Sequence, residues 1–308
     1  MKISVIIPYY NESSTILQTL DGLKQQSLKP SEVLLINSGS NDSSSSIIDD
    51  WILKNNFQDN YKNIYSGEMS PSSSINKGLE NAKNDIIAYM DCGLLIDKNW
   101  LKDNLSVMTE HNSEIVSTCI YTKGENIIDS SFIAQTYGYA RSRPCLPGSL
   151  IRISVFKKIG RFLSNVRSGY DVDFINRINS SNIKRTINYD SQPLTYYDIN
   201  YSSNFFHAFK KIFSYSLAGW RTTNDKKPIL YLLFFFIFFC SFFYAFESIF
   251  IYSYFLTRGY LVPYIKSNKS HLINKPALIV FLPISGLIID VARISGYLFS
   301  LFITNKRN

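Results

Sequence analysis

Polar side chains follow three apolar runs of the chain, at the point where each run ends. Residues 10–12 (Tyr-Asn-Glu), 37–40 (Asn-Ser-Gly-Ser) and 91–93 (Asp-Cys-Gly) each come directly after such a run. Carboxylates can bind a cation or accept a proton, and amides and hydroxyls can hydrogen-bond a polar ligand. A further carboxylate, Asp171, follows Gly169 by two residues and opens a predicted helix. A carboxylate in this position is suited to act as a general base.

The three runs are typical of buried parallel strands. They cover residues 3–7, 33–36 and 86–90, are rich in Ile, Val and Leu, and alternate with segments whose apolar residues recur at helical spacing. This alternation predicts an α/β fold with a mostly parallel sheet covered on both faces. In such sheets ligands bind beyond the carboxyl ends of the strands. We therefore expect the polar clusters to meet at one edge of the sheet.

The stretch 145–190 completes the predicted domain. It contains a short strand at 150–152 and a helix after residue 169 that turns Phe174 and Ile178 inward. A domain of this length, residues 1–204, is large enough for its own core.

Composition limits the partners. The chain has 308 residues, 45% of them hydrophobic and 18% charged, which excludes a disordered chain and a protein made mainly of membrane spans. The net charge of +8 suggests an acidic partner: a nucleic acid, an anionic lipid or a phosphorylated substrate. The basic residues of 206–227 lie beside an apolar tail, so we expect a membrane surface and no nucleic acid.

The C-terminal third is predicted to attach the chain to a membrane. Residues 205–227 alternate aromatic and basic side chains, as in an amphipathic interfacial helix or a packed surface helix. In the region 228–308, two apolar segments near 229–256 and 276–303 are long enough to span a bilayer. Asp290 and Arg293 are expected to pair on one helix face.

The expected topology is a hairpin with the N-terminal domain in the cytoplasm. The opening apolar run is too short for a secretory signal, and both flanks of the two segments are basic, as the positive-inside rule favours. The connecting stretch 257–275 is also basic, which opposes an outer loop. This leaves a shallow hairpin or one interfacial segment as alternatives.

The cysteines predict no special chemistry. Cys92, Cys119, Cys145 and Cys240 show no CxxC spacing, which argues against a zinc module and a disulfide framework. A reducing compartment fits this pattern.

Five ordered motifs resemble those of the family 2 glycosyltransferases, which use nucleotide sugars and have a GT-A fold. The motifs are Ser4–Glu12 (the opening strand and its Pro-x-x-Asn-Glu end), Ile36–Asp42 (an acidic Asp-Gly-Ser turn), Asn76-x-Gly78 (a donor-loop helix), Asp91–Gly93 (the Asp-x-Asp metal motif) and Gly169–Asp173 (the segment of the catalytic base).

The resemblance implies a function and a site. The expected reaction is inverting transfer of a sugar from a UDP- or dTDP-sugar to a lipid-linked or glycan acceptor, at the cytoplasmic face of the inner membrane. The resemblance implies Asp171 as the base, and Asp91 as the ligand of a divalent cation (Mg²⁺ or Mn²⁺) or of the diphosphate. The implied donor pocket consists of Pro8, Tyr10, Glu12, Asn37 and Asn76, together with Asp91.

Three positions depart from the family pattern. Asn37 stands where the family usually has aspartate, Cys92 and Gly93 leave Asp91 without a second acid, and Tyr170 replaces a glutamate. The amide of Asn37 is expected to accept a hydrogen bond from a base N–H. These departures leave an alternative function, a catalytically inactive nucleotide-sugar-binding scaffold on the membrane. Asp173 competes with Asp171 as the base.

Overall fold

The computed structural model describes residues 1–197, 204–223, 232–233, 236–237, 239–240 and 247–302. The chain forms two compact units, each continuous in space and interrupted in sequence. We call residues 1–121 and 143–196 the sheet unit, and residues 122–142 and 197–308 the helical unit. The segment 122–142 therefore leaves the sheet unit and returns to it. The sequence-based boundary at residue 204 stays a prediction.

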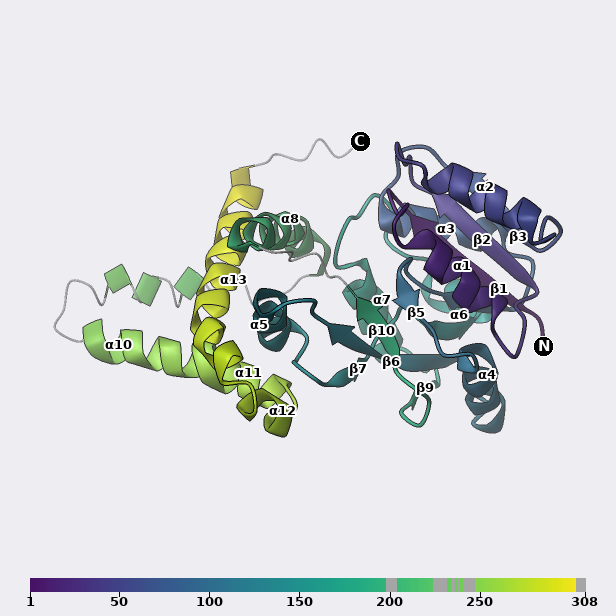
Figure 1. Cartoon of the computed structure of the whole chain (residues 1–308). Helices are drawn as coiled ribbons and strands as arrows, with labels where there is room; N and C mark the ends of the chain where they lie inside the picture. The colour runs from purple at the N-terminus through teal and green to yellow at the C-terminus, as the bar shows by residue number, and fades with distance from the viewer. Residues whose placement is uncertain (198–203, 224–231, 234–235, 238, 241–246, 303–308) are drawn as a thin grey trace. The chain divides into compact units, whose positions relative to one another are not determined.

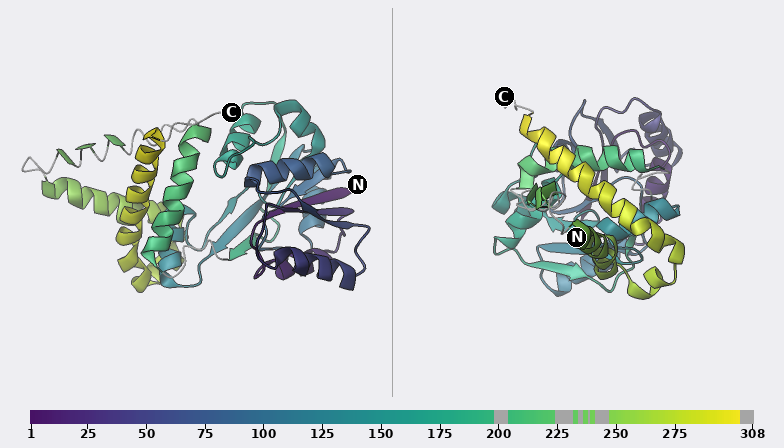
Figure 2. Two further views of the ribbon diagram at one scale, coloured as in Figure 1. Left: turned by 90° about the horizontal axis from the view of Figure 1, so that it is seen from above. Right: turned by 90° about the vertical axis from the view of Figure 1, so that its left-hand side faces the viewer.

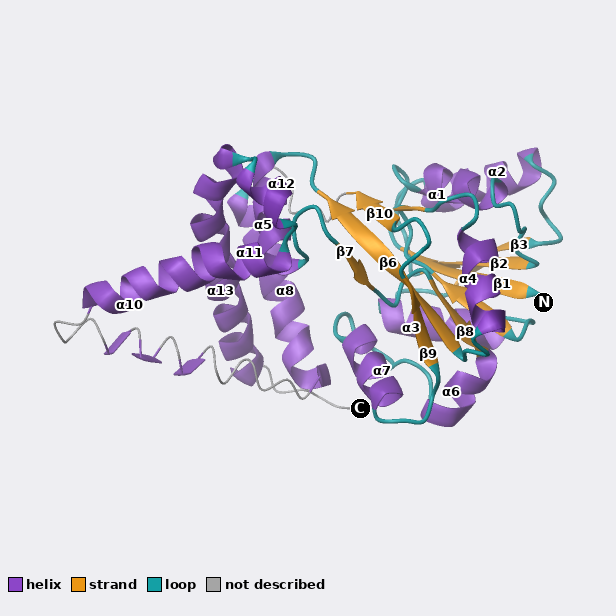
Figure 3. Ribbon diagram, turned by 90° about the horizontal axis from the view of Figure 1, so that it is seen from below, coloured by secondary structure: helices purple, strands orange, loops and turns teal. Residues whose placement is uncertain are grey.

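The sheet unit is built on a mixed sheet, drawn in orange in Figure 3, in the order β3-β2-β1-β4-β8-β6-β10-β5, with β7 and β9 also paired to β6. The strands are β1 (Ile3–Tyr9), β2 (Glu32–Asn37), β3 (Tyr61–Tyr65), β4 (Ile86–Tyr89), β5 (Leu94–Leu95), β6 (Ile115–Lys123), β7 (Ser142–Pro144), β8 (Ser149–Arg152), β9 (Arg185–Asn188) and β10 (Leu194–Tyr197).

Strand direction changes at β8. The neighbours β3, β2, β1 and β4 run parallel, whereas β8 is antiparallel to both β4 and β6. The prediction of an α/β fold is confirmed, but the sheet is mixed rather than mostly parallel. The reason is that β8 follows β6 and β7 through a short reversing loop instead of a crossover helix.

Alternation along β1 supplies two cores, one on each face of the sheet. Ile3, Val5 and Ile7 pack with the helices α1 (Ile16–Lys24), α2 (Ser44–Lys54) and α4 (Trp100–Glu110). Ile6 points to the other face, where it packs with α3 (Pro71–Asn81), α6 (Ile153–Ile159) and α7 (Tyr170–Asn179) (Figure 1). Such two-sided burial explains the continuous apolar run in the sequence.

Gly78 allows α3 to lie directly on β1. A Cβ atom at this position would come within 2.3 Å of Ile6 Cγ2, closer than side chains pack. The glycine of the Asn76-x-Gly78 motif is thus required by helix–sheet packing, because any larger side chain would push α3 away from the strand.

The first three predicted strands are confirmed as β1, β2 and β4, and the strand at 150–152 as β8. One detail was wrong: β1 does not stop at Pro8, because Pro8 still lies opposite Ile36 and the strand ends at Tyr9.

The helical unit contains one long apolar helix and several shorter helices. They are α5 (Ile127–Thr136), α8 (Phe205–Thr223), α10 (Glu247–Tyr254), the π-helix η1 (Phe255–Leu261), α11 (Val262–Lys266), α12 (Lys269–Ile273) and α13 (Pro276–Phe302). α8 runs beside α13 (Figure 2), and Phe132 of α5 packs in the same cluster as Ala208 of α8 and Ile289 of α13.

α13 contains a stretch, Pro276–Ser300, that is long and apolar enough to cross a bilayer, with a mean hydropathy of 2.1 and 44% of its apolar window buried. Core helices of soluble proteins can have the same length and composition, so membrane spanning stays a prediction. Much of the other predicted span, 229–256, lies outside the described residues.

The predicted pair of Asp290 and Arg293 was wrong. Asp290 Oδ2 instead accepts hydrogen bonds from Arg258 Nε at 2.7 Å and from Tyr254 Oη at 3.1 Å. Arg258 lies on η1, 32 residues before Asp290, and both side chains are largely buried. A buried carboxylate favours the partner that also fills the space between helices.

Candidate functional site

The loops that follow β1 and β2 are fastened to each other by their own side chains. Asn11 donates from Nδ2 to Asn41 Oδ1 at 2.9 Å, and its Oδ1 accepts from the Asn41 backbone N–H at 3.0 Å. The Asn11 backbone N–H donates to Ser40 Oγ at 3.0 Å. Asn11 has a φ of +55°, a left-handed conformation that asparagine tolerates better than most residues. The two strand ends therefore form one rigid rim.

Asp42 strengthens this rim. Its carboxylate accepts from the Ser13 N–H at 3.1 Å and from the Ser44 N–H at 3.0 Å. Burial raises the pKa of Asp42, but the hydrogen bonds from Ser44 and Ser13 outweigh that effect and lower the pKa to about 2. Asp42 is thus held as a carboxylate that organises the loops.

Asn37 supports the turn after β2. The residue is 3% exposed, and its Oδ1 accepts from the Gly39 N–H at 3.1 Å and the Ser40 N–H at 2.8 Å. Gly39 has a φ of +86°, which the turn requires. An amide oxygen has two lone pairs, and here both are directed at backbone donors. The expectation that this oxygen accepts from a base N–H is therefore wrong, and Asn37 offers a ligand only its NH₂ group.

The other residues predicted at the first strand end differ in exposure. Pro8 is half-buried inside β1, whereas Tyr10 is 54% exposed beside it. Glu12 is half-buried, and its Oε2 accepts from Thr15 Oγ1 at 2.5 Å. Tyr10 is thus available to a planar ligand, and Glu12 places a negative charge near the end of β4.

Asn76 connects α3 to the segment before α7. Its Nδ2 donates to the Phe162 carbonyl at 2.8 Å, and its Oδ1 accepts from the Phe162 N–H at 3.1 Å. Both ends of the buried amide are therefore used by the backbone. The structure gives Asn76 a positioning role, since it fixes the segment that leads to Asp171.

Asp91 lies at the end of β4 in a negatively charged neighbourhood. Tyr89 Oη donates to Asp91 Oδ1 at 2.7 Å and lies 3.4 Å from Tyr170 Oη on α7. Burial raises the pKa of Asp91 to about 6, and the nearby charges of Asp171 and Glu12 raise it further, against the hydrogen bond from Tyr89. The structure thus brings together three of the predicted acids: Glu12, Asp91 and Asp171.

The two candidate bases on α7 have different surroundings. Asp173 is ion-paired with Arg177, whose Nε and Nη2 lie 2.9 Å and 2.8 Å from Asp173 Oδ2. Arg177 also donates to the carbonyl of Arg161 at 2.9 Å, so this pair ties α7 to the preceding segment. Asp171 stands in the same first turn, after Gly169 with its φ of +82°, and its charge acts on Asp91. This difference favours Asp171 as the base.

The acidic cluster suits a divalent cation that is shared with a ligand. Among the described residues, no group of three or more His, Cys, Asp or Glu side chains could hold a metal ion by itself. Burial raises the pKa of the Cys92 thiol to about 12, so it is no ligand for a hard cation. Asp91, however, is disfavoured as an anion by its neighbours, and a cation beside it would relieve that repulsion. Mg²⁺ commonly takes only one or two protein carboxylates plus phosphate oxygens.

Sequence reasoning missed two residues of this site. Tyr89 was placed in the strand only, although residues two apart in a strand share a face and Asp91 follows at that spacing. Arg143 was not considered. Its positive charge acts on Cys145, as do the charges of Asp91 and Asp171, so all four residues occupy one neighbourhood. No sequence pattern marked Arg143, because its neighbours come from distant segments.

His207, a weaker candidate, belongs to the helical unit. Its Nδ1 lies 3.1 Å from Asn204 Oδ1, which also accepts from the His207 backbone N–H at 2.9 Å. This arrangement is typical of a helix start.

Comparison with known families gives one match. The model of the family described as "Glycosyl transferase family 2" matches residues 4–162, about half of the chain. That range holds the strand ends, Asn76 and Asp91, and stops before α7.

Several curated proteins are similar to this chain over part of their length. Poly(ribitol-phosphate) beta-N-acetylglucosaminyltransferase TarS of Staphylococcus aureus is 30% identical over 128 residues, 41% of this chain and 22% of TarS. Glycosyltransferase AglE of Haloferax volcanii is 25% identical over 199 residues, 61% of this chain and 64% of AglE. An uncharacterized glycosyltransferase of Rickettsia felis is 28% identical over 178 residues, and only 29% of its length is covered. The chain thus spans less than a third of TarS and of the Rickettsia protein.

Two solved structures are similar in fold. Mannosyltransferase PcManGT from Pyrobaculum calidifontis, in complex with GDP-Man and Mn²⁺, has a TM-score of 0.59 at 15% identity, covering 99% of this chain and 88% of PcManGT. S. aureus TarS 1–349 in complex with UDP-GlcNAc has a TM-score of 0.50 at 18% identity, covering 97% and 90% of the two chains. At these identities the likeness concerns the fold alone.

Proposed function

We propose that this chain, which belongs to glycosyl transferase family 2 and is a glycosyltransferase, moves a sugar with inversion from a nucleotide-sugar donor to a lipid-linked or polysaccharide acceptor. Its fold is the α/β, GT-A-like glycosyltransferase fold with a mixed sheet. The observation that carries the proposal is the acidic edge formed by Asp91 and Asp171, where the charge of one carboxylate raises the pKa of the other.

Asp171 is the proposed base. Inverting transfer needs a carboxylate that takes the proton of the acceptor hydroxyl while the oxygen attacks the sugar. Asp171 stands in the first turn of α7 and, unlike Asp173, is not the acid that pairs with Arg177. Asn76 and the Arg177–Asp173 pair hold the segments on either side of it in place.

Asp91 is the proposed contact of the diphosphate, through a divalent cation. The cation would neutralise negative charge on the leaving diphosphate. Tyr89 orients the carboxylate by donating to Oδ1. Arg143 is a second proposed source of positive charge at the same edge. The binding of GDP-Man with Mn²⁺ by a structural neighbour supports this assignment.

The rim formed by the β1 and β2 loops is the proposed seat of the nucleoside. Pro8, Tyr10, Glu12 and Asn37 lie there, and the exposed Tyr10 ring offers a stacking surface. UDP and dTDP sugars are the proposed donors, supported by the UDP-GlcNAc complex of TarS. The relatives named as transferases give no support to an inactive scaffold.

Attachment to the cytoplasmic face of a membrane through the helical unit is part of the proposal. It is supported by the length and hydropathy of α13 and by the basic character of 206–227. The soluble donor is then used on the side where cells make nucleotide sugars.

One experiment tests the transfer function. The full chain in detergent is screened for thermal stabilisation by UDP-, dTDP- and GDP-sugars with Mn²⁺ or EDTA, and each hit is then assayed for donor hydrolysis. A donor present at 100 times its Kd adds about 2.7 kcal/mol to stability. We expect one donor class to stabilise the protein and to be hydrolysed. Stabilisation without turnover, with any acceptor offered, would support the inactive scaffold instead.

A further inference from the structure

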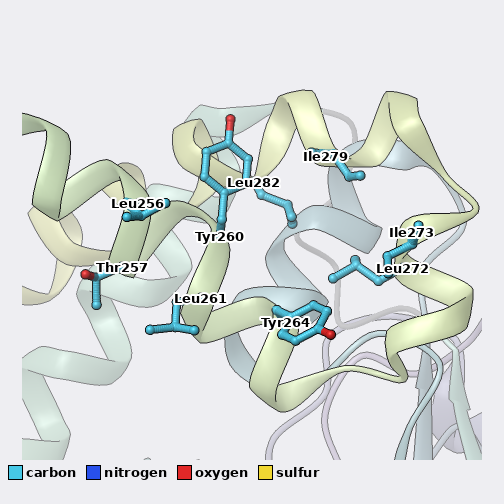
Figure 4. A pocket seen from close by; sticks show the side chains of 9 residues that line it. All are labelled: Leu256, Thr257, Tyr260, Leu261, Tyr264, Leu272, Ile273, Ile279 and Leu282. Atoms are coloured by element: carbon cyan, nitrogen blue, oxygen red, sulfur yellow. The ribbon is translucent and has the colours of Figure 1, made fainter.

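An apolar pocket of about 400 Å³ opens in the helical unit, far in sequence from the acidic edge. η1, α11, α12 and α13 contribute its walls, including Leu256, Tyr260, Tyr264, Ile273, Ile279 and Leu282 (Figure 4). Its volume falls within the range of about 300–1,000 Å³ that is typical of small-molecule sites. No carboxylate, amide or charged side chain is among its wall residues in the described part of the chain.

The wall residues are unusually exposed for their type. Leu256 is 67% and Ile273 is 58% exposed, and Tyr260 is 41% exposed. Contiguous apolar surface of this kind is unfavourable in water by roughly 25 cal/mol for each Å². Such a surface indicates an apolar occupant.

The rim of the pocket is positively charged. Residues 248–289 contain no Asp or Glu, but they contain Arg258, Lys266, Lys269 and Lys275. Two of these cations are engaged inside the unit: Arg258 with Asp290, and Lys266 with the carbonyls of residues 135 and 136.

The other two lysines are exposed at the pocket. Lys269 Nζ lies 5.1 Å from the ring centre of Tyr264, which is itself a wall residue. Lys275 follows Ile273 in the connection to α13, with its Nζ 5.9 Å from the ring centre of Tyr139. Both ammonium groups are therefore next to apolar surface and open to solvent, an arrangement that fits an anion attached to an apolar chain.

We infer that this pocket binds a glycerophospholipid with an anionic headgroup, with part of one acyl chain between η1, α12 and α13 and the phosphate at Lys269 and Lys275. Charge complementarity favours this occupant over a zwitterionic lipid, because the rim lacks any acid. The inference rests on the proposed membrane attachment and deepens it. It also accounts for the basic stretch 257–275, since cations that face an anionic leaflet belong on the cytoplasmic side.

The test uses the full chain purified in detergent and native mass spectrometry. The protein is titrated with phosphatidylglycerol or phosphatidylcholine of identical acyl chains, and retained lipids are counted. Each lysine near an anionic lipid contributes about fivefold in affinity. We expect wild type to retain one phosphatidylglycerol at least tenfold more tightly than phosphatidylcholine. The double variant Lys269→Gln/Lys275→Gln should lose this preference.

Two further variants separate the pocket from general effects. Lys102→Gln/Lys157→Gln removes two exposed lysines of the sheet unit and should leave the preference unchanged. Ile273→Glu places a carboxylate in the pocket wall at an exposed position and should abolish retention without disturbing the core. Donor-induced thermal stabilisation is recorded on every variant, because its retention shows that a failed lipid test concerns the pocket and not the transfer function.

Three outcomes would overturn the inference. One is equal retention of both lipids by wild type. Another is an unchanged preference in Lys269→Gln/Lys275→Gln. The third is retention of a short polyprenyl phosphate with no phosphatidylglycerol, which would make the pocket an acceptor site, or a dimer that Ile273→Glu dissociates, which would make it an interface between copies.

Discussion

The rim of the β1 and β2 loops and the acidic edge of the sheet treat their polar groups in opposite ways. In the rim, Asn11, Asn37 and Asp42 direct their oxygens at backbone N–H groups, and the pKa of Asp42 falls to about 2. At the acidic edge, Asp91 has one hydrogen bond from Tyr89 at 2.7 Å, and its pKa rises to about 6 because of burial and of the charges of Asp171 and Glu12.

The difference separates positioning from chemistry. Satisfied polar groups stabilise a fixed loop shape, whereas crowded carboxylates reduce stability until a ligand or cation arrives. We therefore expect substitutions in the rim to change stability more than rate, and substitutions at the acidic edge to change rate or binding more than stability. The predictions below test this expectation, beginning with the largest effect.

Asp171→Asn should reduce transfer by about 10²–10⁴-fold, because a positioned base contributes that much and an amide cannot accept the proton. Donor affinity, measured by calorimetry, should stay within a few-fold of wild type. Asp173→Asn is the matched control. It breaks the ion pair with Arg177 and should lower thermal stability while leaving most of the transfer rate. Transfer by Asp171→Asn within about tenfold of wild type would remove Asp171 from the mechanism.

Asp91→Ala should weaken donor binding by about 10- to 100-fold in Mn²⁺, since a charged ligand contact is typically worth about 1.5–3 kcal/mol. In EDTA the variant and wild type should bind donor alike. Calorimetric titrations under both conditions measure the difference. Equal affinities in Mn²⁺ would mean that other groups, Arg143 first among them, hold the diphosphate.

The pKa of Asp91 also predicts a pH dependence of stability. The folded chain holds the Asp91 proton up to about pH 6, above the model value of 3.8. The stabilisation from this proton is therefore complete below pH 4 and is lost as the pH rises to 6. Asp91→Asn should raise the free energy of unfolding at pH 7.5 by on the order of 2 kcal/mol over wild type.

The gain from Asp91→Asn should shrink toward zero at pH 4. Unfolding is followed by the fluorescence of Trp51 and Trp100, which are buried in the sheet unit. A gain that is the same at both pH values would contradict a titrating Asp91 and would indicate a simple packing effect.

Asn11→Ala should have the smallest functional effect. It removes the bonds to Asn41 and places alanine at a φ of +55°, which together cost about 1–2 kcal/mol of stability. Asn11→Gly separates the two causes, because glycine accepts this φ without strain. The transfer rate per folded molecule should change less than tenfold. A larger loss would place the rim in the chemistry and remove the contrast drawn above.

Local pattern was sufficient for much of the fold. β1, β2 and β4 are buried on both faces, so their apolar runs could be recognised directly. β3 was missed because its sequence, Tyr-Lys-Asn-Ile-Tyr, is polar and only partly buried at the sheet edge. β6 was missed because its buried positions include Ser117 and Thr118. The antiparallel pairing of β8 depends on loop geometry that composition does not encode.

In the site, sequence order placed the carboxylates but not their partners. Asp91 and Asp171 could be named because each follows a recognisable strand or turn signal. The bridge from Asn76 to Phe162 joins residues 86 positions apart, and the bond from Arg258 to Asp290 joins residues 32 apart. No spacing rule predicts such pairs, since only the folded chain brings them together.

The early position of α5 in the chain affects how the protein is made. α5 ends at residue 136 and carries the fully buried Phe132, while α13, which covers it, begins at residue 276. At a synthesis rate of about 5–20 residues per second, roughly 7–30 s pass between the emergence of the two helices from the ribosome. During that interval the apolar face of α5 lacks its final neighbour. A shortened protein ending at residue 204 would keep α5 in this immature state permanently, so its poor solubility would reflect an interrupted order of assembly and not a defect of the sheet.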